Sequence, residues 1–262
     1  MISEMKSQQT LELEHGVRKS RIPAKLDYIQ SMTGLILALF MWGHLLLVSS
    51  ILLGKDVMYT VTKFLEGKMI FGESYPILVS LVAITIFILF FIHAMIAIRK
   101  FPHSYKQYTT YKSHMRTMKH PDTNLWSYQV FTGFIMFFLG SAHVIIIMMH
   151  PADIGPYASS DRVVSEYMGF LYFFLLLAVE FHGSIGLYKL IIKWGWFEGK
   201  DYKATRKRYK KIKMWVTILF VTLGMATLFK YVQIGLEQRE NNNVGQRYIP
   251  QALVESKVGA RA

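Results

Sequence analysis

Four histidines, His44, His93, His143 and His182, each lie inside a different long apolar stretch of the chain. An ionisable side chain in the hydrocarbon core of a membrane is costly and rarely faces lipid, so each of them indicates a functional site. Two metal centres with two axial histidines each require four imidazoles, which is the number that these four segments supply. A b-type haem, held by its axial ligands and by packing alone, fits that description.

These four stretches and a fifth are long and apolar enough to cross a membrane. The sequence is 52% hydrophobic, which is high for a soluble domain. About 20 helical residues span a hydrocarbon core of about 30 Å, and no alternating pattern suggests a barrel. The sequence therefore predicts an all-α integral membrane protein, a single dihaem domain over residues 1–262. Its five transmembrane helices are expected at residues 27–54, 77–100, 125–150, 166–193 and 207–237, followed by a polar tail at 239–262.

Lysine and arginine are distributed unevenly between the connections. The N-terminal flank and the connections after the second and fourth spans are rich in both, and the other two connections are poorer. The positive-inside rule then predicts a cytoplasmic N-terminus and an outside C-terminus in a multi-pass membrane protein. No apolar region near the start suggests a cleavable signal peptide. Much of the net charge of +13 therefore faces the cytoplasm, where anionic lipid or a soluble partner could bind it.

The direction of each helix assigns a depth to its histidine. His44 and His143 lie roughly 25 and 27 Å along helices that run outward from the cytoplasm. His93 and His182 lie only roughly 9 and 10 Å above the cytoplasmic ends of helices that run inward. The heights therefore predict an outer pair, His44 with His143, and an inner pair, His93 with His182. A zinc or copper site would need three or four ligands at one height, which this arrangement does not offer.

The chain has no cysteine. This excludes haem attachment through a Cys-x-x-Cys-His motif, and it excludes a cysteine-ligated iron–sulfur cluster within this chain. No phosphate-binding loop or nucleotide fingerprint is present, and we expect no nucleic-acid partner. Two haems without any other redox group would make the chain an electron conduit. A lipid-soluble quinone and a protein are the expected donor and acceptor.

Three segments carry a close resemblance to a known family. They read SRIPAKLDYIQSMTGLILALFMWGHLLLVSSILLG at 20–54, HAMIAIRKFPHSYKQY at 93–108 and HGSIGLYKLIIKWGWF at 182–197. In these segments, and in the order and spacing of its four histidines, the chain resembles the dihaem cytochrome b subunits of bacterial menaquinol:fumarate reductases and succinate dehydrogenases. The resemblance covers nearly all five spans and is weakest after Glu237.

The resemblance implies a membrane anchor for an iron–sulfur subunit and a flavoprotein subunit on the cytoplasmic side. It implies that menaquinol is oxidised near the outer face and that electrons pass through two haems b towards fumarate, which a partner subunit reduces to succinate. The same resemblance leaves open a dimer of the whole complex, embedded in membrane lipid.

Two carboxylates are candidates for proton chemistry. Glu66 lies in the first outer connection, near the height of the outer pair, and a carboxylate in reach of a quinol hydroxyl can accept a proton. A loop glutamate is more commonly just solvated, but the resemblance implies that Glu66 is the menaquinol proton acceptor. Glu180 precedes His182 by two residues, about 200° around the helix, so it faces away from that ligand. The resemblance implies transmembrane proton transfer through Glu180; the alternative is a neutral acid bonded to a neighbouring helix.

Five residues near the cytoplasmic ends of the spans are candidate contacts for haem propionates. Buried propionates call for hydrogen-bond donors or cations. The candidates are Gln30, Ser31, Trp126, Lys193 and Lys100. Read singly, the tryptophan could equally be an interfacial aromatic and the lysines topology markers.

Three other functions remain open from the residues alone. A succinate:menaquinone reductase has the same architecture and runs in the opposite direction. Cytochrome b subunits of other respiratory oxidoreductases, such as nitrate reductase or hydrogenase, place their histidines differently. A non-redox metal transporter would favour ligands at successive heights over two level pairs.

Overall fold

The computed structural model describes residues 20–118 and 121–253 of the chain. The described part is built from helices and contains no strand. The elements are α2 (Ile22–Val48), the 3-10 helix η1 (Ser49–Leu53), α3 (Lys55–Leu65), α4 (Lys68–Phe71), α5 (Ile77–Ile98), α6 (Tyr105–Met118), α7 (Pro121–Met149), α8 (Pro156–Val164), α9 (Gly169–Trp194) and α10 (Tyr202–Glu240).

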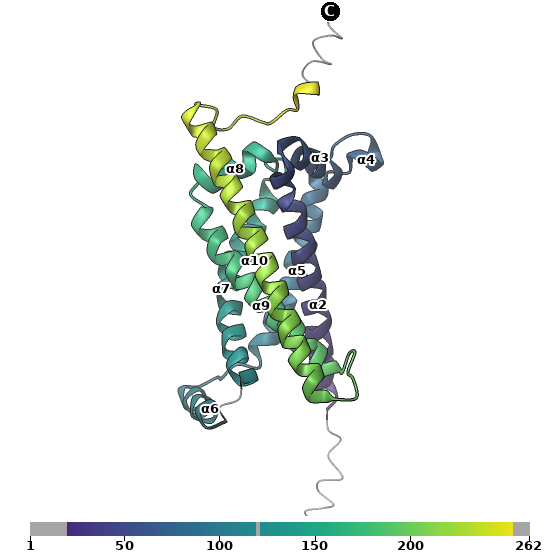
Figure 1. Cartoon of the computed structure of the whole chain (residues 1–262), viewed down its shortest axis with the longest axis vertical. Helices are drawn as coiled ribbons and strands as arrows, with labels where there is room; N and C mark the ends of the chain where they lie inside the picture. Colours follow the sequence, from purple (N-terminus) through teal and green to yellow (C-terminus); the bar gives the residue numbers. More distant parts are fainter. Residues whose placement is uncertain (1–19, 119–120, 254–262) are drawn as a thin grey trace, which may run out of the picture.

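Within the described residues, five helices are long and apolar enough to cross a membrane: α2 with η1, α5, α7, α9 and α10. They lie alongside one another along the long axis of the molecule (Figure 1). Large apolar side chains on their outer faces stay exposed, among them Phe131 at 64% and Phe229 at 71%, as expected of surfaces that contact lipid. The predicted all-α integral membrane fold with five spans is confirmed.

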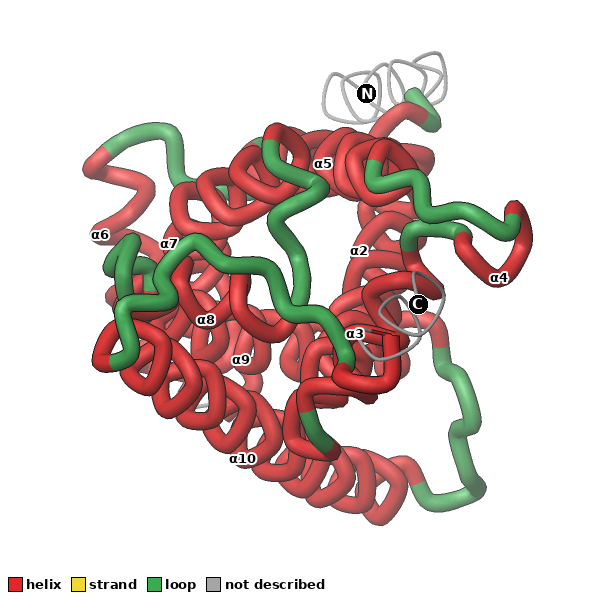
Figure 2. Tube along the Cα trace, turned by 90° about the horizontal axis from the view of Figure 1, so that it is seen from above, coloured by secondary structure: helices red, strands yellow, loops and turns green. Residues whose placement is uncertain are grey.

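Four of the spans form a ring and the fifth lies outside it. α2 packs against α5, α5 against α7, α7 against α9, and α9 against α2. α10 packs mainly on α9, α8 and η1, and Figure 2 shows it along the outer side of the other helices. We call the end of the bundle with α6 and the α9–α10 connection the α6 end, and the opposite end, with α3, α4 and α8, the α8 end (Figure 1).

Several helices begin at other residues than the hydropathy pattern predicts. α2 begins at Ile22 instead of residue 27, with Pro23 in its first turn, where its missing N–H costs no hydrogen bond. α10 begins at Tyr202 instead of 207, because the Asp201 carboxylate accepts hydrogen bonds from the backbone N–H groups of Lys203 and Ala204. α7 starts earlier than residue 125, at Pro121, and α9 later than 166, at Gly169.

The polar tail begins after α10, which ends at Glu240, and its described residues fold back onto the α8 end. The backbone N–H of Gly245 donates to the Asp161 carboxylate at 2.8 Å, and the Tyr248 hydroxyl donates to Asp56 at 2.6 Å. Loss of solvent and the hydrogen bond to Asp56 raise the pKa of Tyr248 to about 12, so this hydroxyl remains a donor at neutral pH. This part of the tail is therefore held on the bundle.

Candidate functional site

The ring of four helices encloses a cavity of about 1020 Å³ that contains the side chains of all four histidines. Its lining is mainly apolar, with polar groups gathered towards the two ends of the bundle. The volume lies at the upper end of the range for small-molecule and cofactor sites. A large, flat apolar group is the kind of ligand that such a cavity fits.

The inner pair lies towards the α6 end. The ring centroids of His93 and His182 are 6.4 Å apart. Nδ1 of His93 lies 3.1 Å from Thr33 Oγ1, and Nδ1 of His182 lies 2.9 Å from the Gln129 carbonyl oxygen. When each Nδ1–H donates to its oxygen, Nε2 is left without a proton and can ligate a metal.

The outer pair lies towards the α8 end, with the ring centroids of His44 and His143 6.1 Å apart. His44 stacks on Phe40, and the edge of Tyr172 meets the ring of His143. Nδ1 of His143 is buried and has no hydrogen-bond partner in the part of the chain that the structure describes. A buried polar nitrogen without a partner is unusual and suits a ligand position.

The structure thus brings together the same two histidine pairs that depth predicts. No group of three or more histidine, aspartate or glutamate side chains able to hold a metal ion occurs among the described residues. Two protein ligands are too few for a zinc site. They suffice for a metal whose other donor atoms come from a macrocycle, so paired imidazoles, the orphaned nitrogen and the apolar cavity together fit haem.

Two glycines allow the rings of the inner pair to lie directly against a neighbouring helix. A Cβ atom on Gly34 would come within 2.8 Å of Cε1 of His93, and one on Gly133 within 3.1 Å of Cε1 of His182. Both distances are shorter than normal contacts, so neither position has room for a larger residue unless the imidazole moves. The two glycines come from α2 and α7, opposite helices of the ring.

A repeat that our sequence analysis missed accompanies these glycines. Each follows a threonine, Thr33 or Thr132, and in both spans the threonine stands eleven positions before a histidine of the outer pair. Thr132 Oγ1 lies 3.5 Å from Nδ1 of His182, which parallels the contact of Thr33 with His93. The repeated Thr-Gly pair was therefore a signal, readable in the sequence, for residues that support the inner pair.

Arg162, the only lysine or arginine in the connection between α7 and α9, is another residue to which the sequence analysis assigned no role. It is 5% exposed and lines the cavity beside Ser159 and Tyr172. Its guanidinium donates to the carbonyl oxygen of Asp153 at 2.5 Å, and no salt bridge of Arg162 lies within the described residues. The signal for it was a lone arginine in a connection whose other charged residues are Asp153, Asp161 and Glu166. A buried cation there suits an anionic group of a ligand near the outer pair.

Glu66 is buried at the α8 end, only 1% exposed, which rules out the solvated-loop reading. It follows the last residue of α3, and its Oε2 lies 2.6 Å from Nζ of Lys63. Thr62 and Leu65 beside it line the cavity. The nearby Glu73, in contrast, is exposed. Glu66 is thus a shielded carboxylate whose charge is shared with one lysine.

Glu180 lines the cavity from α9 and is fully buried. Neither of its oxygens has a hydrogen bond of normal geometry within the described residues. The indole N–H of Trp42 faces this carboxyl without forming a hydrogen bond. Trp42 also stacks on Phe220 of α10, with ring centroids 5.2 Å apart. A carboxyl in this environment is available for proton exchange with a group in the cavity.

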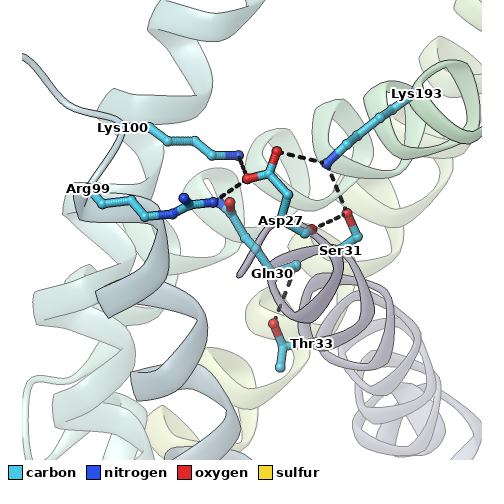
Figure 3. Close-up of polar contacts among 7 residues, drawn as sticks. All are labelled: Asp27, Gln30, Ser31, Thr33, Arg99, Lys100 and Lys193. Carbon is cyan, nitrogen blue, oxygen red and sulfur yellow. Dashed lines mark hydrogen bonds and ion pairs between the residues drawn. The ribbon is translucent and has the colours of Figure 1, made fainter. Parts of the chain in front are cut away.

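All five candidate propionate contacts line the α6 end of the cavity: Gln30, Ser31, Lys100, Trp126 and Lys193. Figure 3 shows four of them around Asp27. Lys193 Nζ lies 3.4 Å from Ser31 Oγ, and Oε1 of Gln30 is buried without a partner in the described part. Trp126 packs on Tyr111 of α6, where loss of solvent raises the pKa of the phenol. The α6 end of the cavity therefore offers hydrogen-bond donors and positive charges that could bind anionic groups.

Comparison with known proteins gives one consistent result. Residues 106–226 match the family described as succinate dehydrogenase/fumarate reductase transmembrane subunit. The chain is 51% identical over 242 residues to the fumarate reductase cytochrome b subunit of Wolinella succinogenes, an alignment that covers 91% of this chain and 94% of the relative. It is 49% identical over 226 residues to the protein of the same description from Helicobacter pylori strain 26695, covering 86% and 87% of the two chains.

Proposed function

The chain belongs to the family of succinate dehydrogenase and fumarate reductase transmembrane subunits, and from that membership we propose that it is the menaquinol-oxidising anchor of a fumarate reductase, with two haems b as electron carriers. The family places it in a respiratory oxidoreductase complex of the bacterial inner membrane, beside an iron–sulfur subunit and a flavoprotein subunit. The flavoprotein subunit would then catalyse the reduction of fumarate.

The observation that carries the proposal is the presence of two facing imidazole pairs in one apolar cavity. His44 with His143 would hold one haem iron, and His93 with His182 the other. When bound, each haem supplies one-electron redox chemistry.

The distribution of basic residues orients the complex. The connections at the α6 end carry dense clusters of lysine and arginine, at residues 99–119 and 200–213. By the positive-inside rule this end faces the cytoplasm, where the two hydrophilic partner subunits would dock. The α8 end, with Glu66, then faces outward, and we place menaquinol oxidation there.

Glu66 is proposed to accept a proton from menaquinol. Quinol oxidation releases two protons, and a carboxylate can act as general base when it lies within hydrogen-bond reach of the hydroxyl. Lys63 holds Oε2 of Glu66, which leaves Oε1 for the substrate.

Glu180 is proposed to move protons across the membrane. It lies in the cavity wall on α9. Towards the α6 end it is followed by His182 of the inner pair, and towards the α8 end it is preceded by Tyr172, whose ring contacts His143 of the outer pair. A carboxyl group held without a fixed hydrogen-bond partner can exchange its proton with water or with a ligand group.

The haem propionates are proposed to contact polar and basic residues of the cavity lining. Those of the inner haem would contact Gln30, Ser31, Trp126, Lys100 and Lys193, and those of the outer haem would contact Arg162.

The test is a visible absorption spectrum and haem assay of the purified complex, together with single histidine replacements. The complex should contain two low-spin haems b. His44→Ala or His143→Ala should remove only the outer haem, and His93→Ala or His182→Ala only the inner one. Menaquinol should drive fumarate reduction faster than succinate drives menaquinone reduction. A complex without haem, or one that loses both haems with every single replacement, would contradict the proposal.

A further inference from the structure

The carboxylate of Asp27 holds three cations at the α6 end (Figure 3). Arg99 and Nζ of Lys100 contact Oδ1, the lysine at 3.0 Å, and Nζ of Lys193 lies 3.5 Å from Oδ2. The two residues Arg99 and Lys100 directly follow α5, and Lys193 is in the last turn of α9. Asp27, from the start of α2, thus ties together three helix ends.

The group formed by Asp27 and its three cations lies beside the cavity, and it includes neither of the two glutamates proposed to carry protons. Lys100 and Lys193 line the cavity, whereas among the described residues neither Asp27 nor Arg99 does. A lysine ammonium has three N–H donors. Its contact with Asp27 therefore leaves donors on Lys100 and Lys193 that can bind an anion inside the cavity.

We infer that Asp27 balances the charge around the inner haem and so lowers its midpoint potential. The inference rests on the proposed function, which places a haem between His93 and His182. A haem b carries two propionate carboxylates, and these together with Asp27 match the three cations that Asp27 contacts; Lys189, which also lines the cavity, has its own counter-charge in Asp122. A cluster of charges that is partly removed from water is most stable when the opposite charges balance.

Neutralising Asp27 leaves one unbalanced positive charge beside the inner haem. An excess of positive charge favours the state that has gained an electron, because the added negative charge is then attracted. Net charge near a redox centre is one of the features that set its potential. Asp27 is therefore a positioning and tuning residue, and it acts through the lysines that line the cavity.

The experiment is a redox titration of both haems, followed by visible absorption, in the complete complex with Asp27→Asn. The asparagine keeps the size of the side chain and one hydrogen-bond acceptor but removes the charge. The midpoint potential of the inner haem, identified by its loss in His93→Ala, should become more positive, and that of the outer haem should stay unchanged. Asp27→Glu, which retains the charge, should leave both potentials near those of the wild type.

Two further variants keep the inference open to contradiction if Asp27→Asn assembles poorly. Arg99→Gln removes a cation from the same group and should shift the inner potential in the negative direction. Glu198→Gln is the control, because Glu198 is an exposed carboxylate in the connection between α9 and α10, at the same end, and is not part of the cavity lining within the described residues. It should leave the inner potential unchanged.

An inner potential that stays constant or becomes more negative in Asp27→Asn would overturn the inference, as would an equal shift in Glu198→Gln. These results are distinct from a failure of the proposed function. If the wild-type complex contained no pair of haems, the proposed function would be wrong. If it contained both haems and Asp27 had no effect, only the role of Asp27 would be wrong.

Discussion

Thr33 of α2 holds the ring of His93 of α5 through a contact of 3.1 Å between Oγ1 and Nδ1. The hydroxyl proton of Thr33 is directed to the carbonyl oxygen of Ile29, at 2.8 Å, so Oγ1 accepts the proton of the imidazole. The hydrogen bond selects the tautomer of His93 that carries its proton on Nδ1. Nε2 is then the free ligand atom, and it is available before any metal binds.

Replacing Thr33 with valine should weaken haem binding at the inner pair. Valine has nearly the same shape but offers no acceptor to Nδ1, and loss of such a supporting hydrogen bond typically costs about 10–100-fold in metal affinity. The inner haem retained per complex after detergent purification measures the effect. Thr132→Val is the control and should cost less, because Thr132 Oγ1 is farther from its imidazole, at 3.5 Å, and the Gln129 carbonyl oxygen accepts from His182 at 2.9 Å. Equal haem loss in both variants would contradict the role assigned to Thr33.

Gly34→Ala should displace His93 and remove the inner haem. The added methyl group would stand 2.8 Å from Cε1 of the ring, well inside normal contact distance, and a shift of α2 would disturb its packing on α9 as well as on α5. Gly133→Ala, with a distance of 3.1 Å to His182, should have a smaller effect. Haem content and the absorption bands of the two haems measure both variants. A complete inner haem in Gly34→Ala would show that the ring tolerates the shift.

The spans and the histidine pairs were predictable because they depend on local quantities. Hydropathy over about 20 residues identifies a span, and the fixed rise of a helix converts position in sequence into depth. These two quantities are enough to predict the pairing of His44 with His143. Helix ends were less predictable, because the cap formed by Asp201 extends α10 into a polar region that hydropathy does not mark.

Contacts that depend on how a helix is rotated about its axis could not be predicted. A helix that is apolar on all sides carries no polar face to indicate which side meets its neighbours. The contact of Thr33 with His93 and the burial of Arg162 and Glu66 depend on such rotations or on loop folding. The repeated Thr-Gly pair was visible in the sequence, but its meaning required the ring of helices.

Glu66→Gln should abolish fumarate reduction driven by menaquinol. The amide keeps the shape of the side chain and can still contact Lys63, but it cannot accept a proton from the quinol. Both haem bands should remain, and fumarate reduction by a soluble artificial donor should continue at the wild-type rate. Glu73→Gln, at an exposed position in the same connection, is the control and should retain menaquinol activity. Wild-type menaquinol turnover in Glu66→Gln would leave only a structural role for the buried ion pair.

Glu180 should be needed for proton movement and not for haem binding. Its carboxyl is fully buried in the cavity wall, and no hydrogen bond fixes it within the described residues. Glu180→Gln preserves size and hydrogen-bonding capacity but not the exchangeable carboxyl proton. It should therefore keep both haems and their spectra while turnover with menaquinol falls. Glu180→Ile, which also loses the hydrogen-bonding groups, should do the same or worse.

Glu180→Asp separates the two roles that remain for this residue. If the carboxyl carries protons, aspartate should retain much of the menaquinol turnover, because it keeps the chemistry and loses only one methylene of reach. If Glu180 only fills space and offers hydrogen bonds beside Trp42, glutamine should be the active variant and aspartate the impaired one. Steady-state turnover with menaquinol, compared with the rate from a soluble donor in the same preparation, measures both. High turnover in Glu180→Gln together with low turnover in Glu180→Asp would assign the residue to packing, because a cavity left by the shorter side chain destabilises the helix interface regardless of proton transfer.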